Sequence, residues 1–99
     1  MAASPTDGLS LEARAQFLVL QRRFVSGLPS RWLEIRDASD GRSLQLALHR
    51  LAGAAGSYGF EQIGLCAREA EALAMQGAAV ALTRALRALE LEIGLVHGG

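Results

Sequence analysis

Apolar side chains recur every three or four residues along most of this chain, which is the spacing of one face of an α-helix. In the N-terminal third this stripe consists of Phe17, Leu20, Phe24, Leu28, Trp32 and Ile35. Ser10 precedes the stripe and can cap a helix. Pro29 interrupts it and should bend the helix or begin a new one. Because the stripe keeps its phase across the interruption, we predict one long, kinked helix to about Arg36.

Three shorter helices are predicted after this one. The segment 37–41 reads DASDG, which is turn chemistry, and Asp40 can cap a second helix that ends in the segment 56–59, GSYG. A third helix is expected from Phe60 to about Gln76. Its inward positions are Phe60, Ile63, Ala67, Ala70 and Ala74.

Gly77 is expected to terminate the third helix, and a fourth helix follows it. The inward positions of the fourth helix are Ala79, Leu82, Leu86, Leu89, Ile93 and Val96. Short connections make successive helices antiparallel. The expected fold is therefore all-α, an up-down four-helix bundle over residues 9–97, preceded by a flexible tail of residues 1–8.

The amino-acid composition favours helices and argues against nucleic acid as a binding partner and against a membrane-spanning segment. Ala, Leu and Arg dominate the 99 residues, whereas β-branched residues are few. The formal net charge is zero and the ten basic residues are scattered, which argues against nucleic acid as the main partner. The start of the chain does not resemble a signal peptide, and no stretch reaches the roughly 18 apolar residues of a membrane helix. We expect a cytoplasmic protein, with Cys66 as a half-buried structural thiol.

One of the two histidines lies among glycines, in the segment 48–60, LHRLAGAAGSYGF. On a helical wheel with Leu44 at zero, the other core residues of the second helix fall within about 40°, whereas His49 lies at about 140°. Gly53 and Gly56 share its outer side, at about 180° and 120°. Since Gly in a helix costs roughly 1 kcal/mol relative to Ala, we interpret these positions as keeping the imidazole accessible. Two simpler interpretations remain open: an ordinary solvated histidine, and small residues that permit close helix packing.

The segment around His49 resembles the histidine phosphotransfer (HPt) domain of bacterial phosphorelays. The resemblance is carried by residues 49–59, HRLAGAAGSYG, by the following FEQIGLCAREAEAL with its Ala70-Glu71, and by the upstream FVSGLPSRWLEIRDA. It covers about residues 15–90. It implies that His49 accepts a phosphoryl group from an aspartyl phosphate on a receiver domain and passes it to a response regulator. It also implies a carrier without kinase activity, with Mg²⁺ supplied by the receiver.

Other residues are assigned by their position relative to His49. Many HPt domains have Lys three residues after the histidine, where this chain has Ala52. Arg42, two turns before His49 on the same face, is the better candidate to neutralise a phosphoryl group, and Arg50 the weaker one. The expected docking surface consists of Gln45, Leu46, Ala52, Gly53 and Gly56. Arg68 could border it, although Arg68, Glu69 and Glu71 are more simply read as a solvated face.

Two functions of other classes remain open at this stage. One is a helical adaptor that binds response regulators or kinases without being phosphorylated, and whose function would survive substitution of His49. The other is a small helical enzyme, which needs converging polar groups at inward positions where the sequence has few. No metal site is expected, because the two histidines do not form a Glu-x-x-His pattern.

Overall fold

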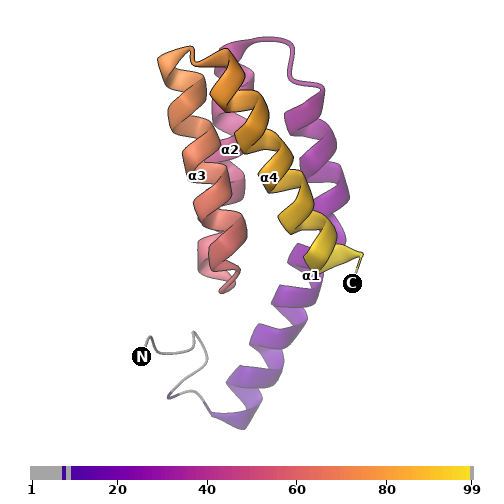
Figure 1. The fold of residues 1–99 in the computed structure, drawn as a ribbon. Helices are drawn as coiled ribbons and strands as arrows, with labels where there is room; N and C mark the ends of the chain where they lie inside the picture. Colours follow the sequence, from indigo (N-terminus) through magenta and orange to yellow (C-terminus); the bar gives the residue numbers. More distant parts are fainter. Residues whose placement is uncertain (1–7, 9, 99) are drawn as a thin grey trace.

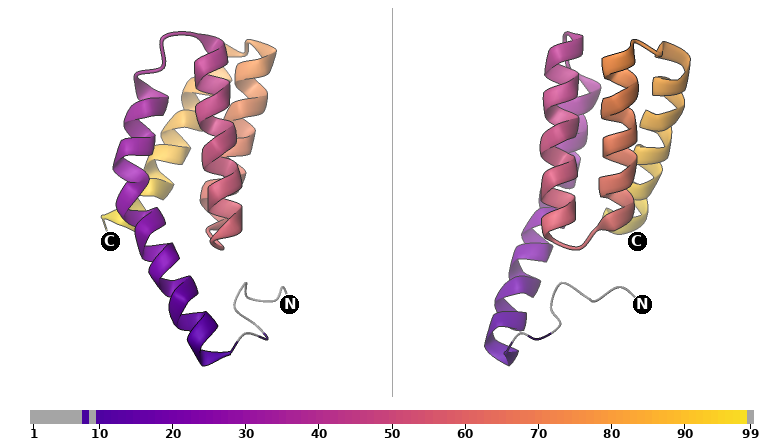
Figure 2. Two further views of the ribbon diagram at one scale, coloured as in Figure 1. Left: turned by 180° about the vertical axis from the view of Figure 1, so that it is seen from behind. Right: turned by 90° about the vertical axis from the view of Figure 1, so that its left-hand side faces the viewer.

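A computed structural model describes residue 8 and residues 10–98. It contains four helices, α1 (Leu11–Arg36), α2 (Gly41–Ser57), α3 (Glu61–Gln76) and α4 (Ala79–His97). Successive helices run antiparallel, and α3 lies between α2 and α4 (Figures 1 and 2). The predicted all-α up-down bundle is confirmed. Apart from Gly8, the tail expected over residues 1–8 lies outside the described residues.

The predicted caps and stops hold the helices at these boundaries. The Ser10 hydroxyl accepts a hydrogen bond from the Ala13 N–H at 3.1 Å, and the Asp40 carboxylate accepts one from the Ser43 N–H at 2.7 Å. Each satisfies a backbone donor that has no partner within its helix. Gly77 ends α3 in the left-handed region, at φ 69°, where a residue without Cβ is favoured.

The first helix is continuous through Pro29, as predicted, and it is not straight. A proline inside a helix bends it, because its ring displaces the carbonyl four residues earlier and its nitrogen donates no hydrogen bond. The N-terminal half of α1 leans away from the other helices and extends past their ends (Figures 1 and 2). Leu20, predicted to face inward, lies in this half of α1 and is 41% exposed.

The core lies where α2 and α3 pack together and where α1 and α4 close over them. The largest side chains that are fully buried are Leu28, Leu48, Leu51, Ile63 and Leu89. Ala79 was also predicted to be inward, and it is exposed, because it begins α4 at the margin of the bundle. This core holds α2 rigidly, with one face buried and the other accessible.

A second group of contacts ties the overhanging part of α1 to the α2–α3 turn. The Phe24 ring lies 5.6 Å from the Tyr58 ring and 5.2 Å from the Phe60 ring, measured between centroids. Gln21 donates a hydrogen bond of 2.8 Å to the Tyr58 carbonyl. Gly59, at φ 83°, makes the turn between these two aromatic residues. The C-terminal end of α2 is thus fixed on the side away from its exposed face.

Candidate functional site

The imidazole of His49 projects from the middle of α2 into solvent. Its side chain is 72% exposed, and the residues that follow it on the outer side of α2, Gly53 and Gly56, have no side chain. A Cβ built on Gly53 meets no atom within 4 Å outside its own helix. The outward orientation predicted for His49, Gly53 and Gly56 is confirmed. A large partner can therefore approach the ring without moving another side chain.

One contact fixes the ring, and it comes from α3. The Nδ1 atom of His49 lies 3.2 Å from the Oε2 atom of Glu71. A carboxylate can only accept a hydrogen bond, so the proton of this contact belongs to Nδ1. Nε2 is the ring nitrogen that does not contact Glu71, and in the neutral ring with its proton on Nδ1 it carries the lone pair. Glu71 is 22% exposed at its side chain, so the contact is partly shielded from water.

The arginines proposed to neutralise a phosphoryl group lie in different surroundings. Arg50 Nη1 stands 3.7 Å from Oε1 of Glu34, which engages it with α1 rather than with α3. Arg42 is exposed in the first turn of α2. Arg68 of α3 extends over α2, and its Nη2 lies 3.7 Å from the place of a Cβ on Gly56. The sequence assigned Arg68 a marginal position, and the structure brings it onto the face that carries His49.

The expected docking residues are not all accessible. Leu46 is 47% exposed, Gly53 and Gly56 are exposed, and Gln45 is half-buried. Ala52 is only 4% exposed, so its prediction as a surface residue is wrong. Its side chain belongs to the core because α2 packs against helices on both flanks, which widens its buried face beyond the apolar stripe.

This geometry agrees with the comparison to known families. The model of the Hpt domain matches residues 10–98, nearly the whole chain. The chain belongs to the Hpt domain family. Members of this family carry phosphoryl groups in phosphorelays, and the exposed histidine on a rigid helix suits that role. Neither the curated proteins nor the solved structures include a match to this Hpt domain.

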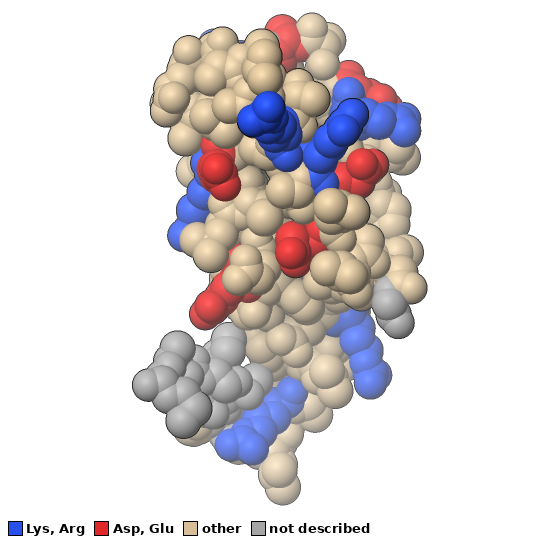
Figure 3. Space-filling model, viewed as in Figure 1, with Lys and Arg blue, Asp and Glu red and all other residues tan. Residues whose placement is uncertain are grey.

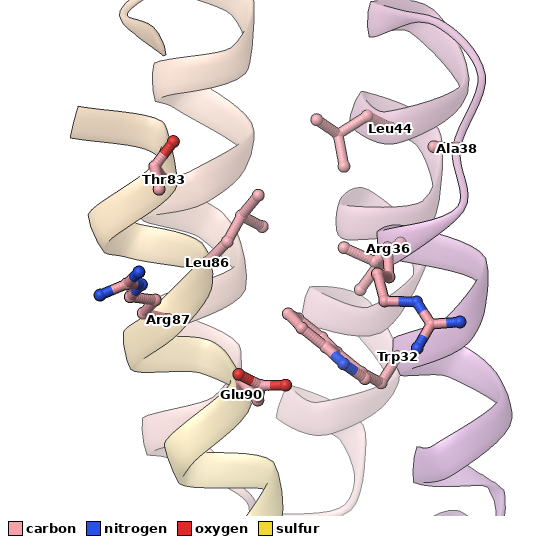
Figure 4. A pocket seen from close by; sticks show the side chains of 9 residues that line it. Trp32, Arg36, Ala38, Leu44, Thr83, Leu86, Arg87 and Glu90 are labelled. Carbon is pink, nitrogen blue, oxygen red and sulfur yellow. The ribbon is translucent and has the colours of Figure 1, made fainter. Parts of the chain in front are cut away.

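One cleft of this Hpt domain lies away from the histidine. It has a volume of about 300 Å³ and separates α1 from α4, and the Trp32 indole reaches across it toward α4 (Figure 4). Its inner surface is apolar, with Ile35, Leu44 and Leu86 among its lining residues. Arg87 and Glu90 are charged lining residues contributed by α4. The lining residues of this cleft include neither histidine nor cysteine.

No second centre of charge gathers on the face seen in Figure 3, and no metal-ligand cluster is found within the described residues. On the face that α4 dominates, basic and acidic side chains are interspersed rather than gathered by sign (Figure 3). Among residues 8 and 10–98, no three His, Cys, Asp or Glu side chains converge as a metal site. In the same part of the chain, no helix is both long and apolar enough to span a bilayer.

Glu71 is the site residue that the sequence reasoning did not identify. It was grouped with Arg68 and Glu69 as a solvated face, because the wheel of α3 alone does not say which side meets His49. A signal was available, since Glu71 belongs to the Ala70-Glu71 pair that contributed to the resemblance. Cys66 is half-buried, as expected, and burial together with the charges of Glu92 and Glu69 raises the pKa of its thiol.

Proposed function

We propose that this Hpt domain accepts a phosphoryl group on Nε2 of His49 from the aspartyl phosphate of a receiver domain and passes it to a response regulator. The observation that carries the proposal is the His49–Glu71 contact on an otherwise bare face. Nδ1 is occupied by the carboxylate at 3.2 Å, so the exposed Nε2 is the available nucleophile. In the neutral ring this nitrogen carries a lone pair that can attack phosphorus.

The transfer step follows from this arrangement. The Nε2 lone pair forms a bond to phosphorus as the acyl phosphate P–O bond breaks, and the receiver aspartate leaves as a carboxylate. The ring retains the Nδ1 proton and gains positive character, which the Glu71 carboxylate stabilises through the existing hydrogen bond. In the reverse direction the N–P bond breaks, and the lone pair returns to Nε2. No proton needs to enter or leave the site in either direction.

Positioning and charge neutralisation are divided between the two proteins. Phosphoryl transfer depends mainly on in-line geometry and on cations that offset the charge of the phosphoryl oxygens. In our proposal the receiver contributes Mg²⁺ and an acidic pocket, and this domain contributes the nucleophile without kinase activity of its own. Arg42 is the cation on α2 available to the phosphoryl group, since Arg50 is engaged by Glu34.

The docking surface is the exposed side of α2 around His49, bordered by α3. Gln45 and Leu46 lie before the histidine, and Gly53 and Gly56 after it. Ala52 supplies no exposed side chain and supports this surface from within the core. A hybrid histidine kinase that carries a receiver domain could dock on the same surface.

Transfer from a receiver domain tests the proposal. Receiver domains from the same organism, phosphorylated on aspartate, are mixed with the wild-type protein and with a His49→Gln variant. Acid-labile, base-stable label on the wild type alone is the expected result. Absence of label with every receiver, from a protein shown to be folded, would refute it and leave the phosphorylation-independent adaptor as the explanation.

A further inference from the structure

The groove between α2 and α3 contains a hollow one to two helical turns from His49. It has a volume of about 310 Å³ and is lined by Gly56, Glu61, Gly64, Leu65 and Arg68. Gly64 lies at a close approach of the two helices. A Cβ there would meet the Ala52 carbonyl oxygen at 3.7 Å and the Gly56 nitrogen at 3.8 Å. The hollow exists because both helices have glycine at its floor.

This hollow shares Gly56 with the docking surface around His49. Since α2 and α3 run antiparallel, His49 lies opposite Glu71, and Gly56 lies opposite the turns of α3 that precede Glu71. The distance from His49 to Gly56 is seven residues, or about 10 Å along α2. Gly53 lies between them and has open space above it. A helix laid along the groove would cover the histidine and the hollow together.

The rim of the hollow carries two opposite charges in a fixed order. Arg68 lies nearer to Glu71 along α3, and Glu61 lies seven residues before Arg68, about two turns away. Between them Leu65 is 55% exposed, which leaves an apolar surface with no cover from its own chain. The rim therefore presents, from His49 outward, a cation, an apolar side chain and an anion.

Resting on the proposed function, we infer that this hollow is the part of the docking surface that selects the receiver domain. Its occupant is an apolar side chain on a receiver helix. On the side nearer the phosphorylated aspartate, an acidic residue of that helix pairs with Arg68. About two turns away, a basic residue pairs with Glu61. Such charge matching chiefly favours the correct partner and its rate of association, whereas the buried apolar side chain contributes affinity.

Filling the hollow tests its role. The Gly56→Leu variant adds a side chain whose Cβ meets only the flexible end of Arg68, so the helix is retained. Gly94→Leu is the matched control, because Gly94 is exposed on α4 with no atom within 4 Å of its Cβ. With the receiver that phosphorylates the wild type most rapidly, we expect Gly56→Leu to slow transfer at least tenfold and Gly94→Leu to leave it unchanged. Wild-type transfer rates for Gly56→Leu would overturn the inference.

Reversing one charge tests the order at the rim. Arg68→Glu is expected to weaken binding of that receiver about tenfold at low salt, and Arg84→Glu, the same change on an exposed turn of α4, is expected to have no effect. Replacing the matching acidic residue of the receiver with Arg should restore binding to the Arg68→Glu variant. Equal effects of the two reversals would show that only net charge matters and would contradict a defined rim.

Failure of the inference is distinguishable from failure of the proposed function. Phosphoramidate is a small donor that transfers its phosphoryl group to imidazole with loss of ammonia and needs no docking surface. We expect it to label His49 equally in the wild type and in Gly56→Leu. Equal labelling with unequal receiver transfer supports the hollow. A wild type that no receiver phosphorylates would overturn the proposed function and the inference with it.

Discussion

At His49 the decisive feature is the identity of the atom that remains free. A surface imidazole has two ring nitrogens that can react, and a carboxylate at Nδ1 leaves only Nε2. Gly53 then leaves that side of the ring open to a partner. The site therefore centres on a single histidine, and its reactivity depends on which ring nitrogen is exposed and on the residues around the ring.

Glu71→Gln tests whether charge, and not only shape, matters in this contact. Glutamine keeps the length of the side chain and an acceptor oxygen, but it does not stabilise the positive character that the ring gains on phosphorylation. We expect transfer to slow about tenfold, which corresponds to about 1.4 kcal/mol in the barrier. Glu69→Gln is the control, because Glu69 is exposed on a different side of α3 and makes no contact with His49. Equal rates for all three proteins would contradict the role of Glu71.

Cys66 offers a second test at the residue scale. Partial burial, followed by the negative charges of Glu92 and Glu69, raises the pKa of its thiol, so less thiolate is present at neutral pH than in the unfolded chain. Iodoacetamide should therefore alkylate the native protein more slowly than the urea-unfolded protein at pH 7 to 8. The difference should narrow as the pH rises. Equal rates in the two states would show that the thiol is not protected.

At the scale of single elements, α2 depends on its cap and on its contact with α3. The cap fixes where the helix begins, and hence the angular position of His49, which lies eight residues after Gly41, the first residue of α2. The contact with α3 brings Glu71 to the ring. Both features can be changed without substituting His49 or Glu71.

Asp40→Asn tests the cap through its pH dependence. The hydrogen bond from the Ser43 N–H lowers the pKa of the Asp40 carboxyl in the folded protein. Its stabilisation is therefore present above the ordinary aspartate pKa and is lost as the pH falls through the lower, folded value. Asparagine also caps helices but does not titrate in this range. We expect the melting temperature of Asp40→Asn to fall less than that of the wild type when the pH is lowered from 5 to 2.

The control for this cap is Asp40→Ala, which should be less stable than either protein at pH 7, because the Ser43 N–H loses its acceptor. If the melting temperatures of the wild type and Asp40→Asn fell equally across the acidic range, the charge of Asp40 would not contribute to the cap.

Gly64 tests how closely α2 and α3 must pack. An alanine Cβ there would meet its neighbours at 3.7 to 3.8 Å, which is ordinary contact, so Gly64→Ala should keep or raise the stability to urea. Gly64→Leu should destabilise the fold by roughly 1–3 kcal/mol, because a larger side chain forces the two helices apart. Gly94→Leu on the open side of α4 should show no such loss. Unchanged stability of Gly64→Leu would mean that the helices are not held at this separation.

At the scale of the whole molecule, sequence patterns determined more of the fold than of the site. The caps at Ser10 and Asp40, the stop at Gly77 and the outward direction of His49 could all be predicted, because each depends on neighbours in the sequence. These local features suffice to define four helices and their order.

The features that could not be predicted depend on how one helix is rotated against another. The His49–Glu71 and Arg50–Glu34 contacts join residues on different helices, and a helical wheel does not give that rotation. Ala52 was misplaced for a related reason, since the width of a buried face depends on how many helices flank it. Leu20 shows the converse, because it belongs to the apolar stripe of α1 and is nevertheless 41% exposed.

The most direct measurement of the central claim is the position of the phosphoryl group on the ring. The protein labelled with ¹⁵N is phosphorylated by its receiver domain, and long-range ¹H–¹⁵N NMR spectra distinguish the two ring nitrogens of His49. The account predicts phosphorus on Nε2, with the proton retained on Nδ1 beside Glu71. Phosphorus on Nδ1, or on any residue other than His49, would contradict it.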